Sequence, residues 1–171
     1  MAPDHLTSNL QTKQHDYRVQ IRRANVGDAS AISNVLEQAF SEYRTLYTSQ
    51  GYTTTAITAD EVIKRMSEGP MWVALFDERV AGTVAAVAKR DSLYVRGMGI
   101  VPSARGKRIG EKLLEHVQKF AVDGGHKRLT LSTTPFLHRA IRLYENFGFR
   151  RIAGESSDLH GTPLFSMYKN L

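Results

Sequence analysis

A short basic segment of this sequence has the residue types and the spacing that suit binding of a phosphate group. The segment Arg105–Gly110 follows an apolar run that ends at Pro102, and it precedes an amphipathic run. This order predicts a strand, then a turn, then the first turn of a helix. The start of a helix leaves about four backbone N–H groups without partners and carries roughly half a positive charge. A phosphate supplies what those groups lack.

Two common phosphate-binding motifs are absent from this region. A P-loop has the pattern Gly-x-x-x-x-Gly-Lys-Ser/Thr, but Gly99 lies too far before Gly106, and Lys107 is followed by arginine. A dinucleotide-binding fingerprint beginning at Gly97 requires glycine at the position of Pro102. The usual markers of ATP binding and of nicotinamide binding are therefore missing.

Size and composition indicate one globular domain. The chain has 171 residues, of which 42% are apolar and 23% are charged, and these values argue against a disordered or a membrane protein. Residues 1–16 are polar and predict a flexible N-terminal tail, and residues 17–171 predict a single domain. No run of about 18 apolar residues and no signal-peptide pattern occurs, so we expect no membrane partner and a cytoplasmic location.

The charge balance leaves several partners open. A formal net charge of +6 fits a nucleic acid, an anionic ligand or an ordinary soluble surface, and the last is the commonest meaning of so modest an excess. The absence of cysteine excludes disulfides, thiolate metal sites and a cysteine nucleophile, and it fits a reducing compartment. His5 and His15 have no ligand residue at the next helical turn, so we expect no metal site.

Hydrophobic periodicity predicts the elements that must position the basic segment. A helix is expected after Asp28, which would cap it, and a polar, tyrosine-rich loop is expected over Glu42–Ile57. A second helix with a capping box begins at Thr58, and others run from Ile109 to Gly124 and from Pro135 to Gly148. The predicted strands are Tyr17–Arg23, Met71–Phe76, Val80–Val87, Leu93–Val101, Arg128–Ser132, Phe149–Gly154 and Leu164–Tyr168. This order implies a mixed sheet with helices on both faces.

The strand before the basic segment contains two glycines, Gly97 and Gly99. Glycine inside a strand weakens it and usually marks a bulge or a close approach by another backbone or a ligand. We therefore expect this strand to be irregular where it approaches the phosphate-binding turn.

Two stretches of the sequence resemble signatures of the GNAT superfamily of N-acetyltransferases. The coenzyme-A-binding signature, Gln/Arg-x-x-Gly-x-Gly/Ala after Val-x-Pro, is matched by Arg105–Gly110 after Ile100-Val101-Pro102, except that Arg108 stands where the family usually has glycine. The segment Leu143–Phe149 is similar to the family pattern Leu-Tyr-x-x-x-Gly-Phe. The resemblance covers Tyr17 to Tyr168, with the same order of elements.

The resemblance implies an α/β fold of mixed α+β type. Its central sheet has about six or seven strands, flanked by about four helices. The fourth strand is bulged and splays from the fifth, and the pantetheine arm of coenzyme A lies in the opening. The implied cofactor-binding residues are Met98 and Ile100, whose backbones bond the pantetheine, and those whose N–H groups surround the pyrophosphate, namely Arg105, Gly106, Lys107, Arg108, Ile109 and Gly110.

The implied activity is transfer of an acetyl group from acetyl-CoA to a primary amine, of a small molecule or a protein, by direct attack. Tyr144 matches the family tyrosine that donates a proton to the departing sulfur, although its helical spacing alone favours a core role. Glu42, Tyr94, His138 and water remain candidate bases. Leu137 replaces a family asparagine. The tyrosines expected at the acceptor are Tyr43, Tyr47 and Tyr94.

Two other functions stay open at this point. A non-catalytic acyl-CoA sensor module would bind the cofactor without turnover. A nucleic-acid-binding domain would use the basic helix, but the sequence lacks a recognised reader motif, so we expect no nucleic-acid partner. A homodimer is a further expectation that follows from the resemblance.

Overall fold

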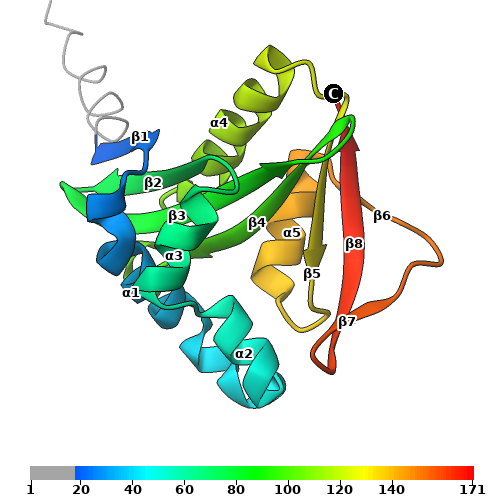
Figure 1. The fold of residues 1–171 in the computed structure, drawn as a ribbon, viewed down its shortest axis with the longest axis horizontal. Helices are drawn as coiled ribbons and strands as arrows, with labels where there is room; N and C mark the ends of the chain where they lie inside the picture. Colours follow the sequence, from blue (N-terminus) through cyan, green and yellow to red (C-terminus); the bar gives the residue numbers. More distant parts are fainter. Residues whose placement is uncertain (1–17) are drawn as a thin grey trace, which may run out of the picture.

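A mixed sheet runs through the centre of residues 18–171, the part of the chain that this computed structural model describes (Figure 1). Within these residues its strands are β1 (Val19–Arg23), β2 (Met71–Phe76), β3 (Arg79–Ala88), β4 (Ser92–Ile100), β5 (Arg128–Thr133), β6 (Arg150–Arg151), β7 (Ser157–Leu159) and β8 (Thr162–Asn170). Their order is β1-β2-β3-β4-β5-β8-β6, with β7 paired to β8. Only β4 and β5 pair in parallel in this described part.

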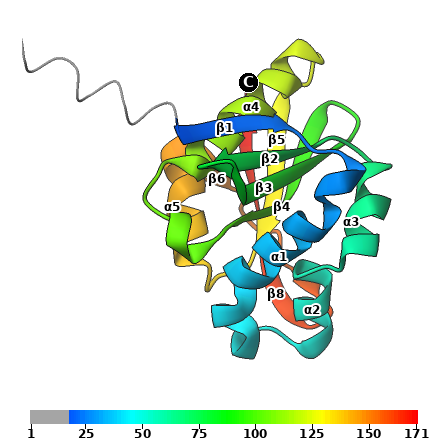
Figure 2. The same cartoon turned by 90° about the vertical axis from the view of Figure 1, so that its left-hand side faces the viewer.

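Helices cover both faces of the sheet, as predicted. The α-helices found in residues 18–171 are α1 (Ala29–Phe40), α2 (Ser49–Thr55), α3 (Ala59–Met66), α4 (Ile109–Asp123) and α5 (His138–Phe147). α1 and α3 pack on one face and α4 and α5 on the other, and Figure 2 shows α5 and α1 on opposite sides of the sheet. The expected mixed α/β class is confirmed, and the sheet of the described residues has one strand more than the seven predicted because β7 was not predicted.

The core follows the hydrophobic pattern of the sequence. The apolar face predicted for α4 is buried against the sheet, and its fully covered side chains are Leu113, Leu114, Val117 and Ala121. Removing such side chains from water contributes roughly 1.5–3 kcal/mol for each leucine or valine. The capping box at Thr58 is also present, because its hydroxyl accepts from the Glu61 N–H and the Glu61 carboxylate accepts from the Thr58 N–H.

The segment predicted as a loop, Glu42–Ile57, is helical instead. It contains a 3-10 helix over Ser41–Leu46, followed by α2. Gly51 and three consecutive threonines lower the helix propensity, which explains the wrong prediction. Tertiary contacts override that propensity: the Thr48 hydroxyl accepts from the Gly51 N–H at 3.0 Å and donates to the His160 carbonyl at 2.8 Å.

Two other boundaries differ from the predictions. The strand expected over Phe149–Gly154 shrinks to β6, and Gly154, with φ of +78°, lies in the turn that follows. Tyr17, the expected start of the first strand, lies outside the described residues, as does the predicted tail 1–16.

Asp28 does not cap α1 with its side chain. Its carboxylate instead accepts from the Asn25 N–H at 2.9 Å and from both terminal nitrogens of Arg22 at 2.8 Å. These hydrogen bonds, chiefly those from Arg22, lower the pKa of Asp28 below its ordinary value. Asp28 therefore ties β1 to the turn before α1.

We expect Asp28→Ala to lower the free energy of unfolding by about 1–2 kcal/mol at neutral pH. Because the folded-state pKa is depressed, this stabilisation is present above the ordinary Asp pKa of about 3.9 and is lost as pH falls through the folded pKa. Urea unfolding between pH 7 and about pH 3 measures the difference between wild type and variant, which should shrink on acidification. Asp123→Ala, which removes an exposed carboxylate, is the control, and a pH-independent difference for Asp28→Ala contradicts this account.

Candidate functional site

The strands β4 and β5 pair over only part of their length. Their parallel register runs from Ser92 opposite Arg128 to Val95 opposite Leu131, and beyond this point the two strands separate. On its other side β4 carries a bulge against β3, where Gly97 has φ of +57°. The expected bulged and splayed fourth strand is confirmed, and the glycine in the bulge allows the left-handed backbone.

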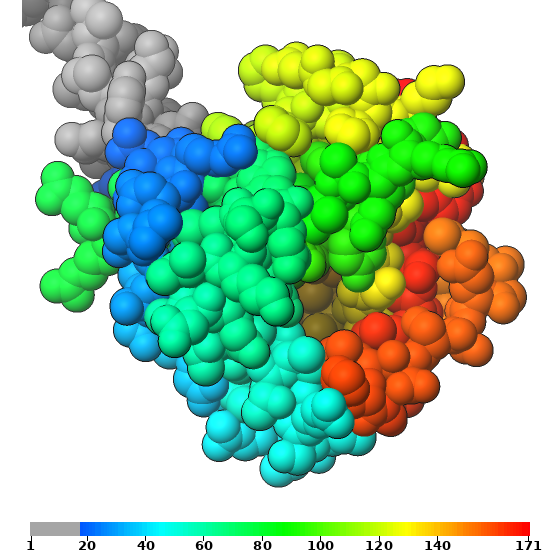
Figure 3. Space-filling model, viewed as in Figure 1, coloured from blue at the N-terminus to red at the C-terminus, as the bar shows by residue number. Residues whose placement is uncertain are grey.

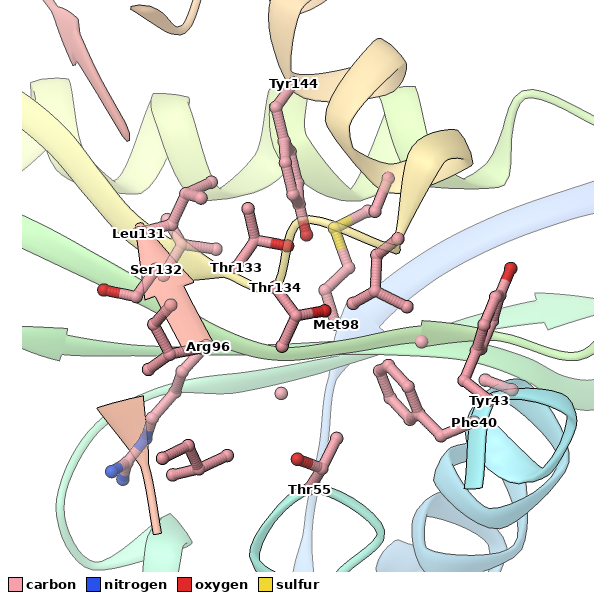
Figure 4. Close-up of a pocket in the computed structure, with 18 of the residues that line it drawn as sticks. Phe40, Tyr43, Thr55, Arg96, Met98, Leu131, Ser132, Thr133, Thr134 and Tyr144 are labelled. Carbon is pink, nitrogen blue, oxygen red and sulfur yellow. The ribbon is translucent and has the colours of Figure 1, made fainter. Parts of the chain in front are cut away.

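A cavity of about 410 Å³ occupies the opening between the two strands (Figure 4). Its walls come from β4, β5, α1, α3, α5 and the segment around α2. Figure 3 shows a hollow at this place, between α3 and the orange segment that precedes β8. The cavity therefore lies between the two helical layers of the molecule.

The start of α4 lies beside the cavity on the side of α5. A Cβ at Gly110 would lie 2.6 Å from Leu143 Cδ2, 3.1 Å from Ile100 Cδ1 and 3.3 Å from Met98 Cε. A side chain here would push aside the end of the Leu143 side chain, so the glycine lets the first turn of α4 approach α5 and β4 closely. Met98 and Ile100 also line the cavity, so this contact connects the helix start to the cavity wall.

The turn before α4 adopts backbone conformations that leave space around it. Gly106 has φ of +78°, and a Cβ there would meet no atom within 4 Å. Arg108 has φ of +60°, an unusual value for a residue with a side chain, at the position where the family usually has glycine. The predicted irregular turn at a helix start is present, and its N–H groups from Ile109 onward lie in the first turn of α4.

The basic side chains of this turn have partners within the protein. Arg105 pairs with Glu42, which also lies 3.6 Å from Arg139. Arg108 pairs with Glu111 at 2.8 Å, and Lys107 Nζ lies 5.5 Å from the centroid of the Phe76 ring. These contacts hold the basic side chains around the turn, beside the backbone N–H groups of the helix start.

Tyr144 extends from α5 with its hydroxyl directed into the cavity (Figure 4). Its ring is almost fully buried and packs edge-on against Phe149, with 5.8 Å between centroids. Burial raises the pKa of the hydroxyl, and the neighbouring Tyr47 and Tyr94 add to the rise. The hydroxyl therefore remains protonated at neutral pH and can act as a hydrogen-bond donor.

The three tyrosines predicted near an acceptor, Tyr43, Tyr47 and Tyr94, all line the cavity. Tyr47 is buried edge-on against Phe136 at 4.9 Å, and burial raises its pKa to about 12. Their role at the acceptor stays a prediction, and the helical structure around Tyr43 and Tyr47 differs from the loop predicted there.

The candidate bases are placed less favourably. Among the residues that line the cavity, neither Glu42 nor His138 is present, whereas Tyr94 and Leu137 are. The Glu42 carboxylate is held by two arginines at the rim.

Within residues 18–171 no group of His, Asp or Glu is placed to hold a metal ion, and no helix there is long and apolar enough to cross a membrane.

Sequence reasoning missed three arginines of the cavity wall, Arg65, Arg96 and Arg139. Arg96 carried a signal, because it is a charged residue inside an otherwise apolar and glycine-containing strand. Arg65 carried none, because a cation in the last turn of a helix is common there for its interaction with the helix dipole.

A splayed strand pair with a helix start and a buried tyrosine beside its opening is the arrangement expected of a transferase that uses an acyl-coenzyme A. Residues 34–149 match the family model described as the acetyltransferase (GNAT) family. The chain belongs to this family, and its activity is that of an acetyl-CoA-dependent N-acetyltransferase.

Individual relatives agree with this assignment. The Escherichia coli strain K12 protein named uncharacterized N-acetyltransferase YjgM is 33% identical over 138 residues, which cover 77% of this chain and 82% of that protein. The Danio rerio N-acetylaspartate synthetase is 37% identical over 89 residues, 51% of this chain and 31% of that protein. The PaiA N-acetyltransferase of Thermoplasma acidophilum, solved with coenzyme A, has a TM-score of 0.77 at 16% identity over 90% of this chain and 99% of that one, which shows the shared fold.

We expect Gly110→Ala to disturb the start of α4. The added Cβ would overlap Leu143, and overpacking of this kind costs about 1–3 kcal/mol, of which the better helix propensity of alanine offsets at most about 1 kcal/mol. Thermal unfolding and coenzyme A titration should show a lower melting temperature and weaker binding. Glu115→Ala, on the exposed face of the same helix, is the control, and unchanged stability and affinity in Gly110→Ala contradict the proposed packing role.

Proposed function

We propose that the cavity brings acetyl-CoA and a primary amine together from opposite faces of the sheet. Met98 and Ile100 contact the start of α4 on one face, so this face suits the cofactor. Phe40, Tyr43 and Arg65 line the cavity from the α1 and α3 face, so this face suits the acceptor. The main support for the proposal is the separation of β4 from β5. Through this opening, a cofactor on one face of the sheet and an acceptor on the other can meet.

The residues of the α4 face would hold coenzyme A mainly by backbone groups. In this proposal, the backbones of Met98 and Ile100 bond the pantetheine, and the N–H groups of Arg105–Gly110 surround the pyrophosphate. The open space at Gly106 supports this, since nothing blocks an approaching anion there. Attraction to a helix terminus contributes only about 0.3–2 kcal/mol, so several charge-assisted N–H bonds must act together.

Acetyl-CoA, when bound, supplies a thioester that an amine nitrogen can attack directly. The chain then acts mainly by holding the two reactants at reacting distance. In the proposed step a bond forms between the neutral amine nitrogen and the acetyl carbon as the carbon–sulfur bond breaks, and the proton that the nitrogen loses passes through water to the departing sulfur. The Tyr144 O–H would donate a hydrogen bond to that sulfur. Because its pKa is raised whereas a thiol has a pKa of about 8.5, we expect Tyr144 to stabilise the departing thiolate by a hydrogen bond that it keeps sharing.

The size of the cavity favours a small acceptor over a folded protein. About 410 Å³ must receive the end of the pantetheine arm as well as the acceptor amine. An N-terminal residue of a peptide is the second candidate. A cytoplasmic location, a homodimer and a single domain over residues 17–171 stay predictions.

We expect Tyr144→Phe to lower kcat by roughly 10²-fold or more, the size of effect typical of a lost proton or hydrogen-bond donor, with an unchanged Kd for coenzyme A. Thiol release from acetyl-CoA in the presence of an amine panel measures kcat. Tyr168→Phe, which removes a hydroxyl that does not line the cavity, is the control.

Full activity of Tyr144→Phe would remove the proposed role of this hydroxyl. Tight coenzyme A binding by the wild type without turnover of any amine in the panel would favour the sensor module instead.

A further inference from the structure

The acidic and basic side chains that line the cavity are all positively charged. Four arginines line it, Arg65, Arg96, Arg105 and Arg139, and no aspartate or glutamate does so among the described residues. An acceptor amine is itself a cation before it reacts, with a pKa of about 10.4 for a lysine-like amine. A purely cationic acceptor would therefore be repelled by this wall.

Arg105 and Arg139 are compensated because both contact Glu42 at the rim. Arg96 pairs with Glu68, but its Nε is buried and has no hydrogen-bond partner. Figure 4 shows Arg96 leaving β4 on the side opposite to Tyr144. Its unpartnered donor therefore belongs to the acceptor side of the cavity.

Arg65 is the least compensated of the four. Its Nη2 donates to the Thr54 carbonyl at 3.0 Å, and within residues 18–171 it forms no ion pair. Its Nη1 lies 3.5 Å from the place of a Cβ on Gly97, so the guanidinium lies over the bulge at which β4 leaves β5. Burial lowers the pKa of Arg65 and the charge of Arg96 lowers it further, whereas the more distant charges of Glu68 and Glu61 partly offset this.

A half-buried arginine held beside a second arginine suits a ligand that brings a negative charge. The planar guanidinium presents several N–H donors in a fork that matches the two oxygens of a carboxylate. The backbone contact to Thr54 holds this fork in place before any ligand arrives. The neighbouring wall from Phe40 and Tyr43 is aromatic and can take an apolar side chain.

We propose that the acceptor is a small amine that carries a carboxylate, an amino acid or a close analogue, with its carboxylate bound by Arg65 and assisted by Arg96. This inference rests on the proposed function, because it assigns the acceptor of that same cavity. A carboxylate on Arg65 holds the acceptor over the bulge of β4, on the side of the sheet opposite to the start of α4.

Matched acceptors test the proposal. Wild-type kcat/KM is measured for leucine against isoamylamine and leucinamide, and for phenylalanine against phenethylamine. We expect the free amino acids to react at least 10-fold better than the amines and amides. Aspartate is compared with asparagine, so that the panel also tests the effect of a second carboxylate on the side chain.

Variants identify the residue responsible. Arg65→Gln should lower kcat/KM for the preferred amino acid by roughly 10- to 100-fold, the effect of losing hydrogen bonds to a charged group, and should leave the matched amine within about threefold. Arg65→Lys keeps the positive charge but lacks the forked guanidinium, and its kcat/KM for the amino acid should lie between those of the wild type and Arg65→Gln. Arg90→Gln removes an exposed arginine in the turn before β4 and is the control of equal charge change.

A binding measurement distinguishes recognition of the carboxylate from acetyl transfer. N-acetylleucine and N-isoamylacetamide are titrated into the full chain loaded with coenzyme A, and we expect only the carboxylate to bind in a manner that Arg65→Gln weakens. Equal or better turnover of the matched amines overturns the inference and leaves acetyl transfer intact. Arg65-dependent carboxylate binding without turnover of any amine supports the inference and contradicts the proposed catalysis. Failure of both carboxylate preference and carboxylate binding overturns the inference.

Discussion

The loss of pairing between β4 and β5 is the constraint on which the rest of the structure depends. Parallel strands normally continue their hydrogen bonds along the whole length that they share. Here the register ends at Val95 and Leu131, although β4 continues to Ile100 and β5 to Thr133. Buried backbone N–H and C=O groups require partners, and an amide-containing ligand such as a pantetheine arm can provide them. The opening therefore lacks hydrogen bonds between β4 and β5 and offers a place where a ligand can form them instead.

Packing around this opening keeps it from collapsing. α1 fills one side of β4, since a Cβ on Gly99 would already be 3.2 Å from Ala39 and Leu36. α4 and α5 fill the other side and meet at Gly110 and Leu143. The glycines at these contacts bring helices close to the strand, and Gly97 lies in the bulge of β4 against β3. The same few residues thus set the width of the cavity and the place of the helix start beside it.

The sequence predicted those parts of the molecule that local pattern controls. The apolar face of α4, the capping box at Thr58 and the stop of α5 at Gly148 all follow from spacing and capping chemistry. α2 was missed because its stability comes from contacts with the distant β7–β8 turn rather than from its own residues. Arg65 was missed for a similar reason: its position over Gly97 depends on how α3 packs on the sheet, and no local pattern records that.

A structure of the chain with coenzyme A tests the central claim most directly. The account predicts the pantetheine arm between β4 and β5, the pyrophosphate on the N–H groups of Arg105–Gly110, and the sulfur beside the Tyr144 hydroxyl. A pyrophosphate bound anywhere else, or a pantetheine arm outside the opening between the two strands, would contradict it.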